Sequence, residues 1–244
     1  MPMQHPVRIF ARAAMAAAAI LIPATAAAQT ATPPTATAPR PPQTAISPPM
    51  PPYVSPNKEV DLMTPEGAAL LGAEWKSVEA KIVESPAIPR SLPEYKTTYD
   101  IQPHAGEAGF DDSKWPVIGA KGLADRRGGG KVSFIWYRAN LTIPAKVGDF
   151  DTAGTMVVLS VIVDDYAEIW VNGQMPRRIG YPSPATIQGF NMPNRVLLAE
   201  SVKPGDQFQI AIFGINGPIS VAPTNFVFVR EVKVEFYPIL SSFR

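Results

Sequence analysis

The sequence has 244 residues, a formal net charge of +1, 28 prolines and no cysteine. A charge this small gives no general attraction to nucleic acid, so we expect no nucleic-acid partner. The lack of cysteine excludes disulfides, zinc–thiolate sites and cysteine nucleophiles, and stability must come from an ordinary hydrophobic core.

The first 28 residues have the pattern of an export signal. Arg8 and Arg12 precede the apolar run Ala13–Pro23, and three alanines follow just before Gln29, where we expect cleavage. A membrane anchor is the alternative, but the run is shorter than the roughly 20 residues that cross a bilayer. Cleavage lowers Lys+Arg from 22 to 20 against 21 acids, so the mature charge is near −1. The sequence therefore predicts a periplasmic or secreted protein without a transmembrane segment after cleavage.

Residues 29–58 are rich in proline, alanine, threonine and serine. Such a composition cannot bury enough apolar surface to offset the entropy lost on ordering, which predicts a disordered tether.

The lead-in of residues 59–94 contains a helix signal. Thr64 stands at the N-cap position and Pro65 at the first helical position. Apolar residues then recur at helical spacing: Leu70, Leu71, Trp75 and Val78. We expect this helix to end near Ser85–Pro86 and to cover a sheet.

Residues 95–238 change to the period of two that is typical of strands. The expected strands are Tyr95–Ile101, Val132–Ile143, Thr155–Val163, Tyr166–Val171, Arg195–Leu198, Gln207–Phe213 and Phe226–Tyr237. Apolar and polar residues alternate in several of them, which indicates half-buried antiparallel strands. The prediction is an all-β fold, an antiparallel β-sandwich or jelly roll, with one N-terminal helix after the tether.

The stretch VDDYAEIWVNGQ places two adjacent acids, Asp164 and Asp165, between two of these strands. One interpretation is that they form a tight turn, because Asp accepts hydrogen bonds from the backbone amides that follow it. The other is that one carboxylate orders a rim loop or helps to hold a ligand hydroxyl or Ca²⁺. We predict no cofactor, and a structural Ca²⁺ is the one ion that the pattern leaves open. Trp170 is either a core residue or part of a site.

Four segments, taken together, resemble the galactose-binding-like jelly roll, which forms the sugar-binding domain of many exported glycosidases. They are GFDDSKWPVI (Gly109–Ile118), FIWYRANLTIPA (Phe134–Ala145), VDDYAEIWVNGQ (Val163–Gln174) and VKPGDQFQIAIFGINGP (Val202–Pro218). The pattern is also similar to the N-terminal module that precedes a propeller in some gluconolactonase-type proteins. The residues that would hold metal and substrate in a propeller are not in this sequence, so the resemblance implies a fold, and a lactonase activity is not carried over from it.

Candidate ligand-binding residues lie mainly in the long connection between Pro176 and Asn194, since long loops on a rigid sandwich commonly carry function. An arginine pair there would suit the carboxylate of a uronate. The predicted set is Arg177, Arg178, Tyr181, Gln188, Asn191 and, from the connection between the last two strands, Asn216. The alternatives are solvated surface charges for the arginines and turn capping for Asn216. ADRRGGGK (Ala124–Lys131) lacks the spacing of a phosphate loop and is interpreted as a flexible loop.

These observations favour an exported β-sandwich without catalytic activity that binds a carbohydrate or sugar-acid ligand, or docks to a partner enzyme acting on one. The alternative is a small periplasmic lyase, isomerase or hydrolase acting on a sugar, a lactone or a plant-derived aromatic, with Tyr181, His104, Arg178 or an acid transferring protons. A third hypothesis is a structural partner protein of an envelope complex. A deep pocket would favour the enzyme, and a shallow groove would favour binding.

Overall fold

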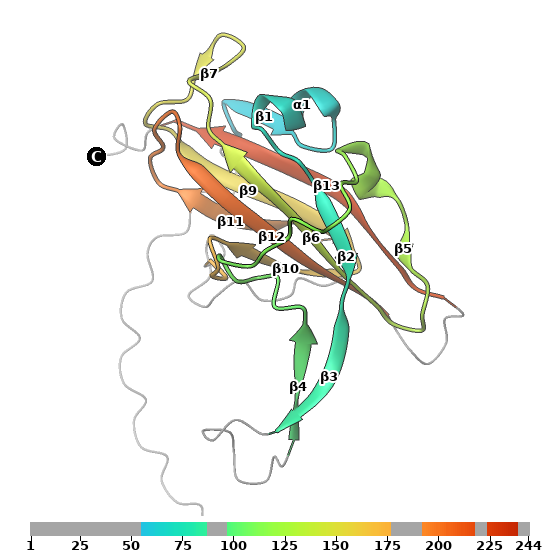
Figure 1. Ribbon diagram of the computed structural model, residues 1–244. Helices are drawn as coiled ribbons and strands as arrows, with labels where there is room; N and C mark the ends of the chain where they lie inside the picture. Colours follow the sequence, from blue (N-terminus) through green and yellow to red (C-terminus); the bar gives the residue numbers. More distant parts are fainter. Residues whose placement is uncertain (1–54, 87–96, 177–191, 218–223, 239–244) are drawn as a thin grey trace, which may run out of the picture. The chain divides into compact units, whose positions relative to one another are not determined.

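Two antiparallel sheets face each other across an apolar core (Figure 1). The computed structural model describes residues 55–86, 97–176, 192–217 and 224–238, and all of them belong to one compact unit, Thr44–Arg244. Within these ranges, no helix is long and apolar enough to cross a membrane. The predicted all-β antiparallel sandwich is confirmed.

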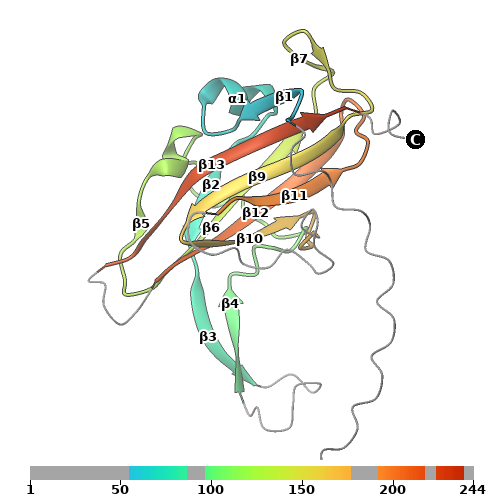
Figure 2. The ribbon, with the colours of Figure 1, turned by 180° about the vertical axis from the view of Figure 1, so that it is seen from behind.

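The first sheet has the order β1, β13, β9, β11, and β5 pairs with β13. Its strands are β1 (Lys58–Asp61), β5 (Arg127–Gly128), β9 (Met156–Asp164), β11 (Asn194–Ala199) and β13 (Phe226–Tyr237). Figure 2 shows this sheet from its own side, with β13, β9 and β11 in front of the second sheet.

The second sheet has the order β10, β12, β6, β2. Its strands are β2 (Lys76–Glu79), β6 (Ser133–Thr142), β10 (Tyr166–Val171) and β12 (Gln207–Asn216). Two ribbons complete the fold, β3 (Lys81–Pro86) with β4 (Thr97–Gln102) and β7 (Lys146–Val147) with β8 (Phe150–Asp151). In Figures 1 and 2 the β3–β4 ribbon extends away from the sandwich.

The core forms because alternate residues of the central strands point between the sheets. In β9 these are Val157, Leu159, Val161 and Val163, none more than 3% exposed. Across the core they meet apolar side chains of β12 and β6. Each such buried side chain contributes about 1.5–3 kcal/mol to folding.

The strands predicted from the period of two all overlap observed strands, and β10 and β13 have the predicted bounds. Strand structure begins earlier than the sequence indicates, however. β1 pairs with β13, and β2 pairs with β6. Part of the expected lead-in thus supplies an edge strand to each sheet.

The predicted helix exists, but its length was wrong. Helix α1 covers only Pro65–Leu70, with Thr64 Oγ1 accepting a hydrogen bond from Gly67 N at 3.1 Å. It ends because Gly72 adopts a left-handed conformation, φ +66°, while Ala73 N donates to Ala68 O at 2.8 Å. This Schellman motif terminates the helix, so the apolar residues that follow lie in strands and loops.

The tight turn predicted at Asp164 and Asp165 was also wrong in one respect. Asp164 is the last residue of β9 in the first sheet, and Tyr166 begins β10 in the second sheet. The two acids therefore form a corner between sheets and do not close a hairpin. Their peptide bond is cis.

Candidate functional site

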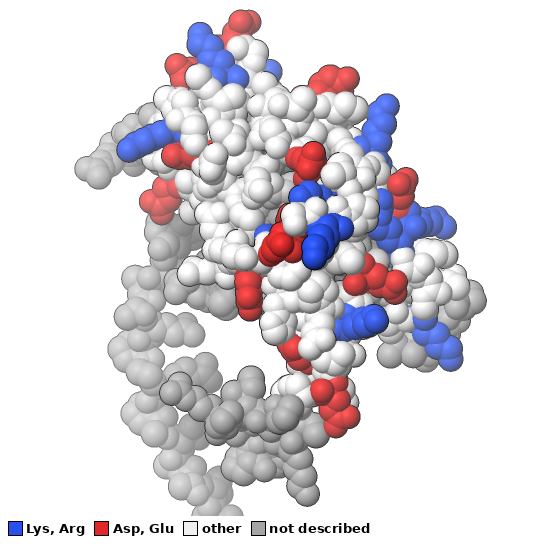
Figure 3. Space-filling view, in the orientation of Figure 1, with Lys and Arg blue, Asp and Glu red and all other residues white. Residues whose placement is uncertain are grey.

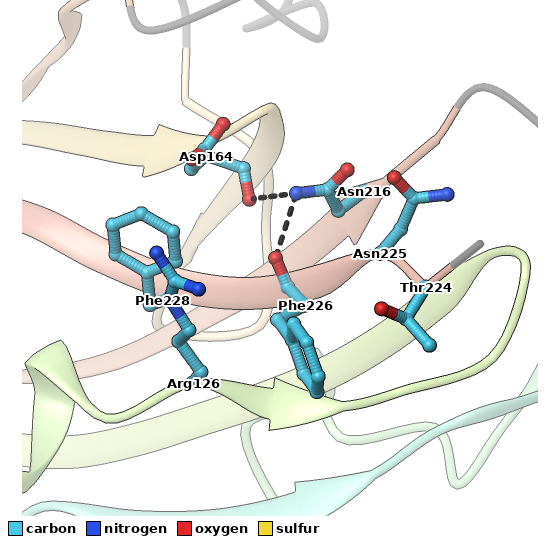
Figure 4. Close-up of a pocket in the computed structure, with 7 residues that line it drawn as sticks. All are labelled: Arg126, Asp164, Asn216, Thr224, Asn225, Phe226 and Phe228. Atoms are coloured by element: carbon cyan, nitrogen blue, oxygen red, sulfur yellow. Dashed lines mark hydrogen bonds between the residues drawn. The ribbon is translucent and has the colours of Figure 1, made fainter. Parts of the chain in front are cut away.

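A small pocket lies at the end of the sandwich where β9 ends and β13 begins. It has a volume of about 180 Å³, below the roughly 300–1,000 Å³ of typical small-molecule sites. Its lining residues come from the loop before β5, the end of β9, the end of β12 and the start of β13 (Figure 4): Arg126, Asp164, Asn216, Thr224, Asn225, Phe226 and Phe228. A pocket of this size would take one terminal unit of a ligand rather than enclose an extended chain.

The floor of the pocket is held by amide side chains. Asn216 Nδ2 donates to Phe226 O at 2.6 Å and to Asp164 O at 3.4 Å (Figure 4). Asn225 Nδ2 donates to Lys131 O, which anchors the glycine-rich loop. Both asparagines are 8% exposed. Their amides therefore join the two sheets and the loop.

One wall of the pocket combines the Phe228 ring with Arg126, and Arg230, which is not a lining residue, lies near the same ring. The guanidinium carbons of Arg126 and Arg230 lie 5.7 Å and 5.9 Å from the Phe228 ring centroid, within the range of cation–π attraction. Arg230 sits where the β13–β9 register shifts between Val229 and Glu231. Bulges of this kind redirect side chains, and this one brings a second positive charge to the same ring.

Asp164 supplies the negative charge of the pocket. It is the Cα partner of Phe228 in the β9–β13 ladder. Burial raises the pKa of Asp164, and the neighbouring Asp165 carboxyl raises it further, whereas Arg230 and Arg126 oppose this shift. Asp165 itself is 8% exposed, and its Oδ2 accepts a hydrogen bond from Gly217 N at 3.4 Å. The pocket thus presents an acceptor that is easier to protonate than an ordinary aspartate.

A second polar cluster lies on the outer face of the second sheet. Arg138 is 2% exposed and its Nε donates to Asp112 Oδ2 at 2.8 Å. The guanidinium also donates to the carbonyl oxygens of Ala105, Glu107 (3.3 Å) and Phe110 (3.4 Å). The segment that covers the sheet accepts hydrogen bonds from the Arg138 guanidinium on every side, so this cluster is structural.

Two residues singled out in the sequence lie away from the pocket. His104 Nε2 is 2.8 Å from Asp100 Oδ2 near the end of β4, and this contact raises the pKa of His104. The Trp170 ring packs against Gly106, where a Cβ would lie 2.6 Å from the ring. Trp170 Nε1 donates to Glu168 Oε2 at 3.3 Å. The tryptophan is therefore a packing residue.

Most of the predicted ligand-binding residues, Arg177, Arg178, Tyr181, Gln188 and Asn191, lie outside the described residues. Asn216 lines the pocket, and its role in binding stays a prediction. Sequence reasoning missed Arg126, Phe226 and Phe228. Arg126 belongs to a loop interpreted as merely flexible, and only the pairing of β5 with β13 places it beside these rings. Within the described ranges, no group of three or more His, Asp or Glu side chains is placed to hold a metal ion.

The charges on the face seen in Figure 3 are mixed, with acidic and basic side chains interspersed. Such a surface has no extended field of one sign that would direct a large polyanion to it. The pocket, by contrast, offers a cation, an acceptor and an aromatic face, which suit the recognition of a small polar ligand.

No protein-family model and no curated protein matches the chain. Solved structures with some likeness include a β-glucuronidase of Bacteroides uniformis, with 18% identity, a TM-score of 0.40, and coverage of 68% of this chain and 17% of that one. A β-glucuronidase of Faecalibacterium prausnitzii has 15% identity and a TM-score of 0.31, over 68% and 32% of the two chains. A β-glucosidase of Kluyveromyces marxianus in complex with glucose has 13% identity and a TM-score of 0.29, over 63% and 16%. With TM-scores this low, we take neither fold nor function from these enzymes.

Proposed function

We propose that this protein is an exported β-sandwich of the galactose-binding-like jelly-roll type that binds a carbohydrate or sugar-acid ligand without transforming it. The observation that supports this proposal is the pocket at the β9–β13 end of the sandwich. A pyranose has one apolar face and a rim of hydroxyl groups. The pocket offers matching groups, with Phe226 and Phe228 as the apolar surface and Asp164 as the hydroxyl acceptor.

The size and composition of the pocket favour binding over catalysis. Its volume of about 180 Å³ is small, and His104 lies near the end of β4 with Asp100 as its partner. The side chains considered for proton transfer that the structure describes do not converge around a deep cavity. Docking to a partner enzyme is compatible with the same ligand, since a binding module can bring an enzyme to its substrate.

One observation favours the alternative, a small periplasmic lyase, isomerase or hydrolase. Burial and the Asp165 carboxyl raise the pKa of Asp164, which lines the pocket. Carboxyl groups with raised pKa values in pockets serve as general acids in many enzymes. Turnover of a sugar or lactone that is lost in Asp164→Asn would support this alternative over simple binding.

The test of the binding proposal is a glycan array followed by isothermal titration calorimetry on the purified protein. We expect one or more monosaccharides or chain ends to bind, and Asp164→Ala to weaken that binding at least tenfold, since a hydrogen bond to a charged group is lost. Asp149→Ala removes an exposed acid outside the pocket and is the matched control. No binding to any neutral or acidic sugar would overturn the proposal.

A further inference from the structure

Formal charges of both signs balance at the pocket. Its charged lining residues are Arg126 and Asp164, one cation against one acid. Two further groups act on the Asp164 carboxyl from outside the lining. Burial raises the pKa of Asp164, Asp165 raises it further, and Arg230 and Arg126 lower it. These neighbours add one more charge of each sign, so the pocket has no net preference for an anion or a cation.

Arg126 and Asp164 line the same pocket without pairing with each other. Arg126 is exposed, and its guanidinium forms no hydrogen bond or ion pair with any described residue. Its guanidinium carbon lies 5.7 Å from the Phe228 ring centroid. Asp164 is close enough for Arg126 to act on its pKa, yet Figure 4 shows no hydrogen bond between the two side chains. A donor and an acceptor thus line one pocket with hydrogen-bonding capacity left for a third group.

A hydroxyl group is the chemical group that suits both side chains. Its oxygen accepts a hydrogen bond from a guanidinium, and its proton is donated to a carboxylate. A carboxylate on the ligand only accepts and would leave Asp164 facing a like charge, whereas an ammonium only donates and would leave Arg126 facing one. The unpaired arginine and aspartate therefore favour an uncharged ligand rich in hydroxyl groups.

We infer that this pocket selects an uncharged sugar by holding two neighbouring hydroxyl groups between Arg126 and Asp164, an inference that rests on the proposed function. The N–H fork of a guanidinium and the two oxygens of a carboxylate can each span two adjacent ligand atoms. The apolar face of the sugar ring then lies against Phe226 and Phe228, in a volume of about 180 Å³ that takes one terminal unit. The ligand class narrows from carbohydrates and sugar acids to neutral sugars.

Calorimetry with three matched sets of monosaccharides tests this selection. The probes are galactose, glucose and mannose, the uronic acid of each and the amino sugar of each. We expect the neutral sugar of the set that binds to exceed both charged counterparts about tenfold in affinity, the equivalent of one hydrogen bond. Its affinity should change less than about twofold between low and high salt, because the ligand carries no charge to screen.

Two results would count against these statements in different ways. A uronic acid or an amino sugar that binds as tightly as the neutral sugar of its set would overturn the inference and leave the proposed function standing. Binding by none of the probes would overturn the proposed function together with the inference.

Two variants should shift the selection in opposite directions. Arg126→Gln leaves the acid without its cation, so the affinity for the amino sugar should rise roughly fivefold relative to that for the uronic acid. Asp164→Asn leaves the cation without its acid and should change this ratio by a similar factor in the other direction. Each value is a ratio of two affinities measured on one variant, so a change in the folded fraction cancels.

Lys131→Gln is the matched control. It removes an exposed cation of the same loop that does not line the pocket, and its ratio should equal that of the wild type. Ratios that stay unchanged in Arg126→Gln and Asp164→Asn, or that move in the same direction in both, would contradict the inference.

Discussion

Two regions of this sandwich use the same three residue types and arrive at different roles. At the outer face of the second sheet, Arg138 lies 5.3 Å from the Phe110 ring centroid and pairs with Asp112. At the β9–β13 end, Arg126 lies 5.7 Å from the Phe228 ring centroid, in the pocket that Asp164 also lines. Arginine, phenylalanine and aspartate occur in both.

The difference is in burial and in hydrogen bonding. Arg138 is 2% exposed, and backbone carbonyls and a carboxylate occupy its donors. Arg126 is exposed and has no ion pair within the described residues. A fully satisfied buried arginine fixes structure, whereas an exposed one beside a pocket is free to meet a ligand. The same residue types therefore indicate a site only when their partners are known.

The largest expected effect comes from removing the buried arginine. Arg138→Met should lower the free energy of unfolding by about 3–5 kcal/mol, because several carbonyl groups lose their buried donor and Asp112 keeps only Lys76 as a cationic partner. Arg126→Met, the same change in the other region, should stay within about 0.5 kcal/mol. Urea unfolding measures both variants. Equal losses would show that the two regions do not differ as described.

A smaller loss of stability is expected when the Asn216 amide at the floor of the pocket is removed. Asn216→Ala removes the donor to Asp164 O and Phe226 O, so two carbonyls between the sheets lose a partner. We expect a loss of about 1–3 kcal/mol in the free energy of unfolding. Asn216→Asp should be no better, since an aspartate cannot donate. Asn140→Ala, an exposed asparagine of β6, is the control and should change stability by less than about 0.5 kcal/mol. A loss no larger than the control's would mean that Asn216 is free to serve only a ligand.

The contributions of Asp112 and Asp164 to the free energy of unfolding should change with pH in opposite directions. Burial tends to raise the pKa of Asp112, but hydrogen bonds from Arg138 and Lys76 outweigh it and bring the pKa below its ordinary value of 3.8. Its stabilising contribution is therefore present above pH 3.8 and is lost as the pH falls through the folded pKa. The pKa of Asp164 is raised above 3.8, so its contribution is present below pH 3.8 and is lost as the pH rises through the folded pKa.

Urea unfolding across an acid series, with Asp112→Asn and Asp164→Asn beside the wild type, measures this contrast. The deficit of Asp112→Asn relative to the wild type should shrink on acidification. Any stability advantage of Asp164→Asn should instead appear as the pH rises. Parallel curves for the two variants would contradict the opposite pKa shifts.

The strands were predictable because their signal is local. In β13 the buried Val232, Val234 and Phe236 alternate with more polar neighbours, which sets both the face and the bounds of the strand. The end of α1 was not predictable in this way. Apolar residues continue at helical spacing past Gly72, and that spacing does not show that this glycine takes a left-handed conformation.

The pocket was the least predictable feature. Asn216 and Asp164 stood out as polar residues at strand ends, but Arg126 becomes part of a site only through the pairing of Arg127 with Val227. That register joins segments far apart in the chain, and local periodicity carries no information about it. Likewise, only the topology shows that Asp164 and Asp165 connect two different sheets.

The smallest expected effect concerns these two acids as a corner. Asn accepts the same backbone hydrogen bonds as Asp, including the one from Gly217 N to Asp165. Replacing both acids with Asn should therefore change the free energy of unfolding by no more than about 1 kcal/mol. If a carboxylate instead binds Ca²⁺, the wild type should gain melting temperature on adding calcium, since a ligand of the folded state stabilises it by mass action. We expect no calcium-dependent shift in either protein by differential scanning calorimetry. A shift in the wild type that is absent from the double Asn variant would assign the two acids to an ion site. The bound Ca²⁺ would then be a second positive charge near Arg126.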